Sequence, residues 1–221
     1  MRLSYRVTTA AITLGLCFMT MADSADAQVI VPPDPITIFG MNANGSGCPA
    51  ASSISATITP DGSMLSITYS EMVAEAGPGT TPAAGRKNCL LTLGIHVPQG
   101  FTYAVIGAEH RGHYNLEPNV VGTQQADYYV SGQRSSLSRK TQFVGDVGTG
   151  SEDDWYRADA LDVAALVWAP CGRDTIAHVN ESVSVNNYMA RQLDPNSRGM
   201  MAQDATDVGI VAVYRLQWRT C

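Results

Sequence analysis

Charged residues are scarce in this sequence, and no part of it gathers positive charge into a patch. Asp, Glu, Lys and Arg together make up 15% of the chain, its formal net charge is −6, and lysine is rare. A protein that binds nucleic acid or an anionic membrane surface needs a concentration of positive charge. The sequence therefore argues against nucleic acid and against an anionic membrane surface as partners.

The motifs of several large enzyme classes are also missing. No G-x-S-x-G elbow and no phosphate-binding loop occurs, and no spacing of Ser, His and Asp points to a catalytic triad. There is no CxxC pair, so a zinc site of the usual spacing is not expected. We therefore predict no catalytic residues, no cofactor and no metal site.

Long apolar runs are missing too, except at the N-terminus. Arg2 and Arg6 precede an apolar run over 7–21, and residues 25–27 (ADA) form a typical signal-peptidase site. This pattern predicts a signal peptide over 1–27 and a secreted or extracellular protein, with the periplasm and the cell surface both open. No later run is long enough to cross a bilayer.

The predicted mature chain, 28–221, keeps four cysteines: Cys48, Cys89, Cys171 and Cys221. Four cysteines in an exported protein predict two disulfides and leave three connectivities open. We favour Cys48–Cys89 with Cys171–Cys221, because each bridge would join the two ends of one half of the sequence. Loop entropy does not separate the alternatives, since either loop contributes about 4 kcal/mol in the chain-entropy model.

Apolar residues recur at a spacing of two through much of the chain, which is the period of a β-strand. Two such stretches, 90–97 and 101–108, flank a tight turn at 98–100 (PQG), so we expect a hairpin of two long strands. Both faces of this predicted hairpin are partly apolar, which suits a central position. A second hairpin is predicted around the turn at 60–63 (PDGS).

Further strands are predicted over 36–41, 127–131, 141–144, 163–168 and 176–185, and on the apolar positions 210, 212, 214, 216 and 218. We expect 145–159 to be irregular and 186–206 to be a long polar loop. Roughly ten short strands with little or no helix predict an all-β, antiparallel β-sandwich. Jelly-roll-like and immunoglobulin-like topologies both remain open. The expected organisation is an extended leader and first strand over 28–45 and a single sandwich domain over 46–221.

Several segments form a recognisable combination: NGSGCP (44–49), GPG (77–79), RKNCLLTLGIHVPQGFTYAV (86–105), RG (111–112), DYYVSG (127–132), DVAALVWAPCG (162–172) and YRLQW–C (214–221). Together they resemble domain-of-unknown-function family 4360, secreted proteins of fungi and bacteria. The resemblance spans nearly the whole predicted mature chain. It implies a secreted, β-sandwich-like domain with the four cysteines as its framework. It implies no reaction, because the function of the family is not established.

Two histidines come nearest to a metal site. His110 and His113 are three residues apart, so on a strand their side chains point to opposite faces unless the chain bends at Gly112. Histidines with a structural or surface role are the favoured interpretation. His110 also departs from the pattern of family 4360, in which we expect an aromatic residue before Arg111.

Acidic residues gather between 152 and 162 (EDDWYRADALD). Paired carboxylates serve in glycosidases and in calcium sites, but no calcium-loop spacing occurs here. A solvated acidic loop is the simpler interpretation of this stretch. A glycan-acting hydrolase that uses 152–162 is nevertheless the main alternative function.

Aromatic residues within the acidic stretch offer stacking surface to a sugar. Trp155, flanked by acids, is the best candidate for an exposed ring, whereas Trp168 and Trp218 are assigned to the core. We name Trp155, Tyr156, Asp153 and Asp154 as candidate ligand contacts. Two N-glycosylation sequons begin at Asn44 and Asn180 and matter only in a eukaryotic source; Asn44, in a loop, is the better candidate.

The leading hypothesis is a non-enzymatic extracellular binding or surface-associated protein whose partner is a polysaccharide or another extracellular protein. This hypothesis is motivated by a β scaffold held by disulfides, by the low content of charged residues and by the missing catalytic motifs. A third hypothesis is a secreted effector that binds a host protein.

Overall fold

The computed structural model describes residues 36–133, 136–160, 166–203 and 212–221. The strands of the described residues are β1 (Ile38–Asn44), β2 (Ile54–Ile58), β3 (Met64–Tyr69), β4 (Val73–Ala76), β5 (Arg86–Ile95), β6 (Phe101–Leu116), β7 (Val121–Val130), β8 (Ser136–Val144), β9 (Ser151–Ala160), β10 (Thr175–Asn186), β11 (Gly199–Ala202) and β12 (Ala212–Thr220). A 3₁₀ turn, η1 (Ala51–Ser53), and one short helix, α1 (Ala190–Leu193), accompany them. No helix in these residues is long and apolar enough to span a membrane. The signal peptide predicted over 1–27 lies outside the described residues.

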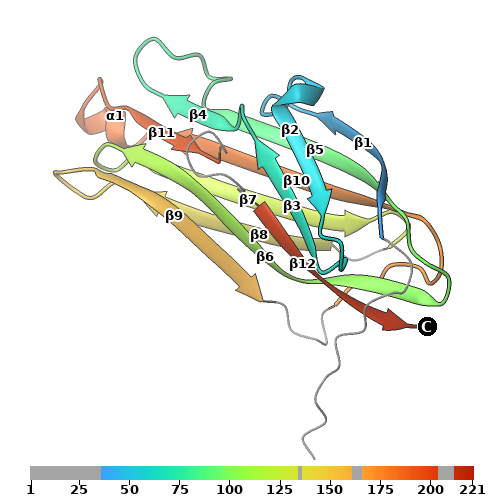
Figure 1. The fold of residues 1–221 in the computed structure, drawn as a ribbon. Coiled ribbons are helices and arrows are strands. Elements are labelled where there is room, and N and C mark those ends of the chain that lie inside the picture. The colour runs from blue at the N-terminus through green and yellow to red at the C-terminus, as the bar shows by residue number, and fades with distance from the viewer. Residues whose placement is uncertain (1–35, 134–135, 161–165, 204–211) are drawn as a thin grey trace, which may run out of the picture.

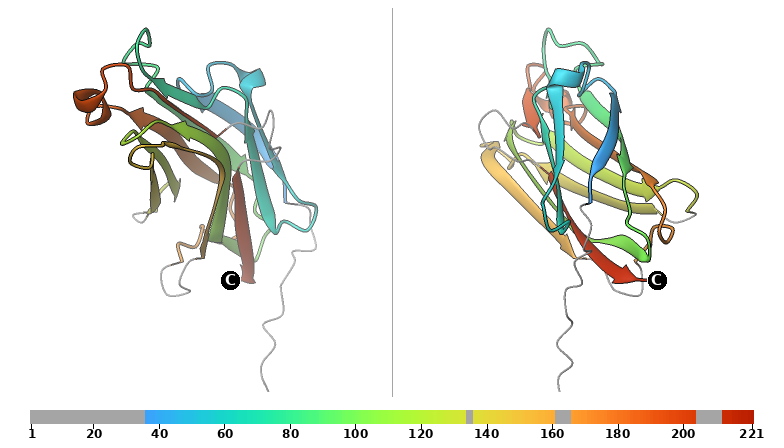
Figure 2. Two further views of the ribbon diagram at one scale, coloured as in Figure 1. Left: turned by 90° about the vertical axis from the view of Figure 1, so that its left-hand side faces the viewer. Right: turned by 45° about the vertical axis from the view of Figure 1, so that its right-hand side comes forward.

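The strands form two antiparallel sheets packed face to face (Figure 1, Figure 2). Sheet A contains five strands in the order β1-β5-β10-β7-β8. Sheet B contains seven: β2-β3-β12-β6-β11-β4 follow one another, and β9 pairs with the other edge of β6. The predicted all-β antiparallel sandwich with little helix is confirmed.

The core lies between the sheets and is built from every second residue of the central strands. β10 contributes Val179 and Val183 from sheet A, and β12 contributes Leu216 and Trp218 from sheet B. The apolar face predicted for the last strand is therefore confirmed from Ala212 onward, while position 210 lies outside the described residues. Each large side chain buried in this way contributes roughly 1.5–3 kcal/mol to folding.

The hairpin predicted over 90–108 is wrong in its pairing. The two long strands form, and the chain turns at Gly100, whose φ of 79° lies in the left-handed region. However, β5 pairs with β1 and β10 in sheet A, whereas β6 pairs with β9, β11 and β12 in sheet B. The turn therefore carries the chain from one sheet to the other. A turn signal fixes where the chain reverses, but it does not specify the partner of either strand.

Two stretches that were expected to be irregular contain strands. All of β9 except its last residue, Ala160, falls within 145–159, and the strand pairs with β6 over ten residues although its sequence is acidic. β11 falls within 186–206, where it pairs with β6 and β4, and α1 precedes it. Pairing with an existing strand overrides weak intrinsic propensity. The charges of β9 also suit an edge strand, because they discourage pairing with another chain.

The strand predicted over 163–168 is only partly described. Residues 163–165 lie outside the described residues, and Trp168 forms a single isolated bridge with Ala104. Arg219 lies over the Trp168 ring, 3.8 Å from its centroid. The expectation that Trp168 belongs to the core is wrong in detail, because its side chain is only half-buried on the outer side of sheet B.

A bulge in β6 decides which side chains of this long strand face the core. The register with β12 shifts between Arg215 and Leu216, so that one extra β6 residue is accommodated. Before the bulge, Tyr103 and Val105 face inward; after it, Ala108 and His110 do. The inward position of His110 follows from this shift.

Candidate functional site

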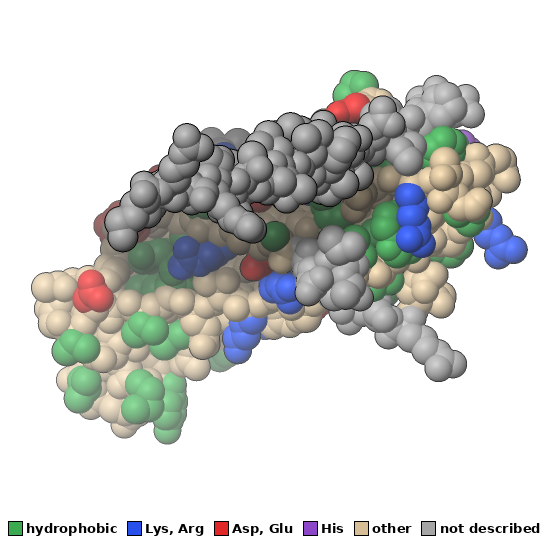
Figure 3. All heavy atoms as spheres, turned by 90° about the horizontal axis from the view of Figure 1, so that it is seen from below, with side chains coloured by type: hydrophobic (Ala, Val, Ile, Leu, Met, Phe, Trp, Pro, Cys, Tyr) green, Lys and Arg blue, Asp and Glu red, His purple; other side chains and the backbone are tan. Residues whose placement is uncertain are grey.

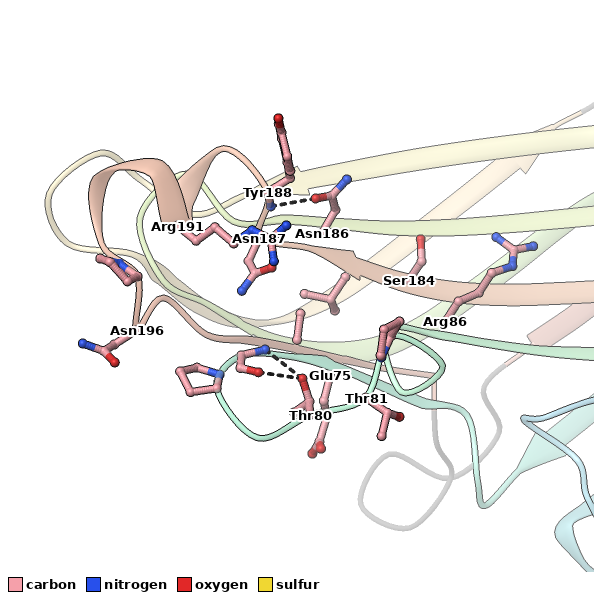
Figure 4. A pocket seen from close by; sticks show the side chains of 17 residues that line it. Glu75, Thr80, Thr81, Arg86, Ser184, Asn186, Asn187, Tyr188, Arg191 and Asn196 are labelled. Carbon is pink, nitrogen blue, oxygen red and sulfur yellow. Dashed lines mark hydrogen bonds between the residues drawn. The ribbon is translucent and has the colours of Figure 1, made fainter.

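A large hollow in the described structure lies at one end of the sandwich, between two segments far apart in the sequence. One is the loop 77–85 that joins β4 to β5, and the other is 186–196, which follows β10 and contains α1. The groove between them has a volume of about 700 Å³ (Figure 4). Its lining is mostly polar, with amides, hydroxyls and two arginines. We refer to it as the end groove.

The loop on the first side of the end groove is held in shape by its own hydrogen bonds. The backbone amide of Gly77 donates to Thr80 Oγ1 (3.0 Å), and the Thr80 hydroxyl donates back to the Gly77 carbonyl (2.8 Å). Gly79 has a φ of 85°, which a residue with a side chain rarely adopts. The amide of Val185 in β10 donates to the Gly85 carbonyl (2.9 Å), which fixes the loop to sheet A.

The segment on the second side is anchored while its outer side chains stay exposed. Asn187 Nδ2 donates to the Ser197 carbonyl (2.9 Å), and the amide of Tyr188 donates to Asn186 Oδ1 (2.8 Å). Ala190 of α1 is buried. These contacts fix the backbone, so the exposed side chains that it carries are presented from a defined support.

Tyr188 and Arg191 form the most distinctive pair in the end groove. The Tyr188 side chain is 57% exposed, and the Arg191 guanidinium lies 5.5 Å from the centre of its ring. Figure 4 shows them on one segment, with Thr80 and Thr81 on the facing segment. An exposed ring next to planar donors can pack against the apolar face of a sugar and bond its hydroxyls.

The arginines of the end groove have no acidic partner in the described part of the chain. Neither Arg86 nor Arg191 forms an ion pair with a described carboxylate, and Glu75 is the one acid among the described lining residues. Elsewhere on the surface, Arg215 pairs with Glu109. The end groove is thus locally positive in a chain with a net charge of −6.

A smaller hollow of about 480 Å³ lies next to the end groove. The two share Glu75, Ala76, Gly77 and Thr80, so the turn that begins at Gly77 stands between them. Arg198 and Glu117 line the smaller hollow, and the Arg198 amide donates to Glu117 Oε2 (2.7 Å). Together the two hollows form a longer polar surface around one turn.

Residues 34–221 match the family model described as a domain of unknown function, DUF4360. The chain belongs to the DUF4360 family. An uncharacterized secreted protein of Arthroderma benhamiae is 31% identical over 189 residues, which cover 86% of this chain and 73% of that protein. The resemblance inferred from the sequence motifs is confirmed. With two disulfides and a secreted relative at this identity, this DUF4360 chain is a secreted protein.

Two solved structures show a distant likeness to this DUF4360 chain. The module TmCBM61, determined in complex with beta-1,4-galactotriose, is 7% identical, with 83% of this chain and 90% of that chain covered and a TM-score of 0.22. The enzymatically active domain of tailspike protein 4 from bacteriophage CBA120 is 11% identical, with 85% and 19% covered and a TM-score of 0.18. At such TM-scores, neither structure bears on the function of the DUF4360 chain.

Both predicted disulfides of the DUF4360 domain are present. Cys48 is bonded to Cys89 and Cys171 to Cys221, with Cα separations of 5.4 and 6.0 Å. The first bridge ties the loop after β1 to β5, and the second ties the segment before β10 to the end of β12. Neither bridge lines the end groove, so their role in this region is support of the scaffold.

The prediction that Trp155 is exposed is wrong. Its side chain is 4% exposed, and Nε1 donates to the Ala202 carbonyl (3.2 Å). The ring packs directly over Gly112 of β6, where a Cβ atom would lie 2.6 Å from it. Phe143 of β8 lies on the other side, with the ring centroids 5.7 Å apart. Trp155 is therefore a core residue that joins the edges of the two sheets, and no ligand contact is assigned to it.

The other candidates from the acidic stretch lie on the surface of β9, away from the end groove. Tyr156, Asp153 and Asp154 are exposed, and Arg111 lies 5.3 Å from the centre of the Tyr156 ring. Asp153 and Asp154 are neighbours on a strand, so their side chains point in opposite directions. They do not form a pair of carboxylates acting on one point.

His110 and His113 point to opposite faces of β6, as their spacing predicts. His113 lies on the outer face, where Nδ1 is 2.9 Å from Asp154 Oδ1 and Nε2 is 3.6 Å from Glu152 Oε1. Among the described residues, no group of three His, Cys, Asp or Glu side chains has the geometry to hold a metal ion.

His110 belongs to a buried polar network that the sequence did not indicate. Glu181 of β10 is at its centre, with Oε1 3.3 Å from His110 Nδ1. The Tyr214 hydroxyl donates to Glu181 Oε1 (2.5 Å), while Gln203 and Gln124 donate to Oε2 (2.9 and 3.3 Å). All five side chains are buried. The network joins sheet A to sheet B through one carboxylate.

Burial and charge act in opposite directions on the two ionisable groups of this network. Burial tends to raise the pKa of Glu181, but the His110 charge and the bonds from Tyr214 and Gln203 outweigh it, and the pKa falls below its ordinary value of 4.5. Burial tends to lower the pKa of His110, but the Glu181 charge outweighs it, and the pKa rises above 6.5. Each shift thus favours the ionised form of its group, because each group interacts with the opposite charge of the other.

The remaining candidate, Asn44, is exposed at the end of β1. The Ser46 hydroxyl of its sequon lies 3.4 Å from Asn88 Oδ1 of β5. Glycosylation at Asn44 stays a prediction. The residues of the end groove were missed because they come from segments that are far apart in the sequence. The signal that was available is the tyrosine in the run NNYMAR at 186–191.

Proposed function

We propose that this protein is a non-enzymatic extracellular binding protein that holds a polysaccharide in the end groove. The pair of Tyr188 and Arg191 carries the proposal, because it presents an exposed ring and planar donors at the edge of a polar hollow. Aromatic rings pack on the apolar faces of sugars, and a few placed polar groups then fix orientation.

The surroundings of Tyr188 support this assignment. Met189 and Leu193 beside it are 66% and 78% exposed, so the segment presents apolar as well as polar groups. By contrast, the face seen in Figure 3 carries Lys and Arg side chains at separate places, with no single basic patch. A ligand recognised through rings and hydroxyls fits the end groove better than one recognised by bulk charge over a wide face.

The test is sedimentation of the predicted mature chain with insoluble polysaccharides: chitin, cellulose, β-glucan and cross-linked polygalacturonate. We expect at least one of them to bind, and Tyr188→Ala to weaken that binding about tenfold, since anchoring aromatics dominate such contacts. Tyr156→Ala is the matched control, because Tyr156 is also exposed beneath an arginine but lies on β9.

Each outcome of the sedimentation experiment has a definite meaning. Loss of binding in Tyr188→Ala with retention in Tyr156→Ala supports the end groove. The reverse result would transfer the site to the β9 surface, where Tyr156, Asp153 and Asp154 were first proposed. Protein that stays in the supernatant with all four polysaccharides would overturn the polysaccharide proposal and favour a protein partner.

A second candidate function is supported by the contacts of His113. Glu152 and Asp154 lie on the same face of β9 and flank this histidine, and paired carboxylates are the chemistry of glycosidases. A glycan-acting hydrolase would release reducing sugar from a polysaccharide, and Glu152→Gln and Asp154→Asn would abolish the release. Absence of any release from the bound polysaccharide would exclude this alternative.

A further inference from the structure

The end groove combines an exposed ring with positive charge that has no described partner. Arg86 extends from the start of β5 and Arg191 from α1, so the two guanidinium groups come from opposite sides of the groove. Glu75 leaves a local excess of one positive charge among the described lining residues. A neutral sugar would require hydrogen bonds only, and two arginines without an ion pair to any described carboxylate exceed that requirement.

Guanidinium groups are suited to anionic oxygens in particular. Their planar donors match the geometry of carboxylate and sulfate groups, and such bonds are about twice as strong as neutral ones. The negative net charge of the rest of the chain would repel an anionic polymer. The end groove offers such a ligand a local excess of positive charge beside an exposed aromatic ring.

We propose that the ligand of the end groove is an anionic polysaccharide, whose carboxylate or sulfate groups bind Arg86 and Arg191 while a sugar ring packs against Tyr188. This inference rests on the proposed function, because it specifies the polysaccharide that the same groove holds. Arg191 has two roles in this arrangement: it contacts the Tyr188 ring, and its outward donors remain available to the ligand.

The experiment is affinity gel electrophoresis of the mature chain with soluble polymers in the gel. Polygalacturonate supplies carboxylates, its fully methyl-esterified form supplies the same backbone without charge, and dextran sulfate supplies sulfates. We expect retardation by polygalacturonate or dextran sulfate, at least tenfold weaker retardation by the ester, and weakening of the anionic interaction as salt increases. The stronger of the two anionic polymers identifies the group that is recognised.

Two double variants separate the end groove from general charge. R86Q/R191Q should weaken binding to the anionic polymer at least tenfold. R111Q/R173Q removes the same charge from two exposed positions outside the groove and should change binding less than twofold. Mobility in polymer-free gels corrects for the altered charge, and thermal melting of both variants checks that they are folded.

The failures of the two proposals can be told apart. Equal binding of polygalacturonate and its methyl ester would overturn the anionic ligand and leave polysaccharide binding in place. Equal weakening by R86Q/R191Q and R111Q/R173Q would also overturn it, because the attraction would then be unspecific. Failure to bind any charged or neutral polysaccharide would overturn the proposed function and this inference with it.

Discussion

His110 and His113 lie three residues apart on β6, and each contacts carboxylates, yet their surroundings are opposite. His110 and its partner Glu181 are 1% and 0% exposed, whereas His113 is one-third exposed and its partners Glu152 and Asp154 are more so. The two sites use the same residue types at similar distances. They differ in whether water can replace the partner.

That difference should decide how much each contact contributes to stability. When a buried charge loses its partner, water cannot solvate it. Breaking the pair therefore lowers the free energy of unfolding strongly, even where the intact pair contributes little to it. An exposed ion pair exchanges its partner for water at small cost, and salt screens it. The contacts of Glu181 should therefore dominate stability, and those of His113 should matter little.

The largest effect expected is that of Glu181→Ala. Removal of this carboxylate leaves buried His110 and three buried donors without their partner, so the free energy of unfolding should fall by about 3–5 kcal/mol. Glu152→Ala, the matched exposed change, should alter it by less than about 1 kcal/mol. Urea unfolding followed by tryptophan fluorescence measures both. Similar losses in the two variants would contradict the comparison.

A smaller effect is expected from Tyr214→Phe. The variant keeps the ring but removes the hydroxyl that donates to Glu181, and a bond to a charged group contributes about 1.5–3 kcal/mol. Tyr156→Phe on the surface should change the free energy of unfolding by about 0.5 kcal/mol or less. The urea midpoints of the two variants measure this difference. A larger decrease in the midpoint for Tyr156→Phe than for Tyr214→Phe would contradict the comparison.

The finest test is the pH dependence of stability, for which only the direction is predicted. The pKa of His110 is raised by folding, so its contribution is complete below its ordinary pKa of 6.5 and is lost as pH rises through the folded value. The pKa of Glu181 is lowered, so its contribution is complete above 4.5 and is lost as pH falls through the folded value. Stability from this pair should be greatest between those ordinary values.

The control for the pH profile uses the neighbouring histidine. His110→Gln should flatten the decline in the free energy of unfolding that begins above pH 6.5. His113→Gln should leave that decline in place. If instead the decline disappeared with His113→Gln and persisted with His110→Gln, the exposed site would be the one that titrates with folding.

Much of the scaffold could be predicted because its signals are local. The faces of β10 and β12 follow from alternation alone, and the turn at 60–63 from its residue types. The disulfide pairing was one of three open connectivities, and the favoured one is present. The partners of β5 and β6 could not be predicted, because pairing depends on strands far away in the sequence.

The errors at the candidate site have a similar cause. Trp155 was expected to be exposed because acids flank it, but it is buried because Gly112 on the adjacent strand leaves room for its ring. The available signal was Gly112 itself, which lies beyond the strand predicted over 101–108 and lacks a side chain that would fill this space. The end groove could not be predicted, since its two sides, 77–85 and 186–196, are about a hundred residues apart and neither forms a site alone.

The place of β12 in sheet B has a consequence for biogenesis. This strand is synthesised after β3 and β6, yet it lies between them and pairs with both. Neither earlier strand can complete its ladder until the late segment arrives, so a growing chain stays open for nearly the whole of its synthesis. In this secreted protein, sheet B can therefore be completed only after the last strand has been synthesised.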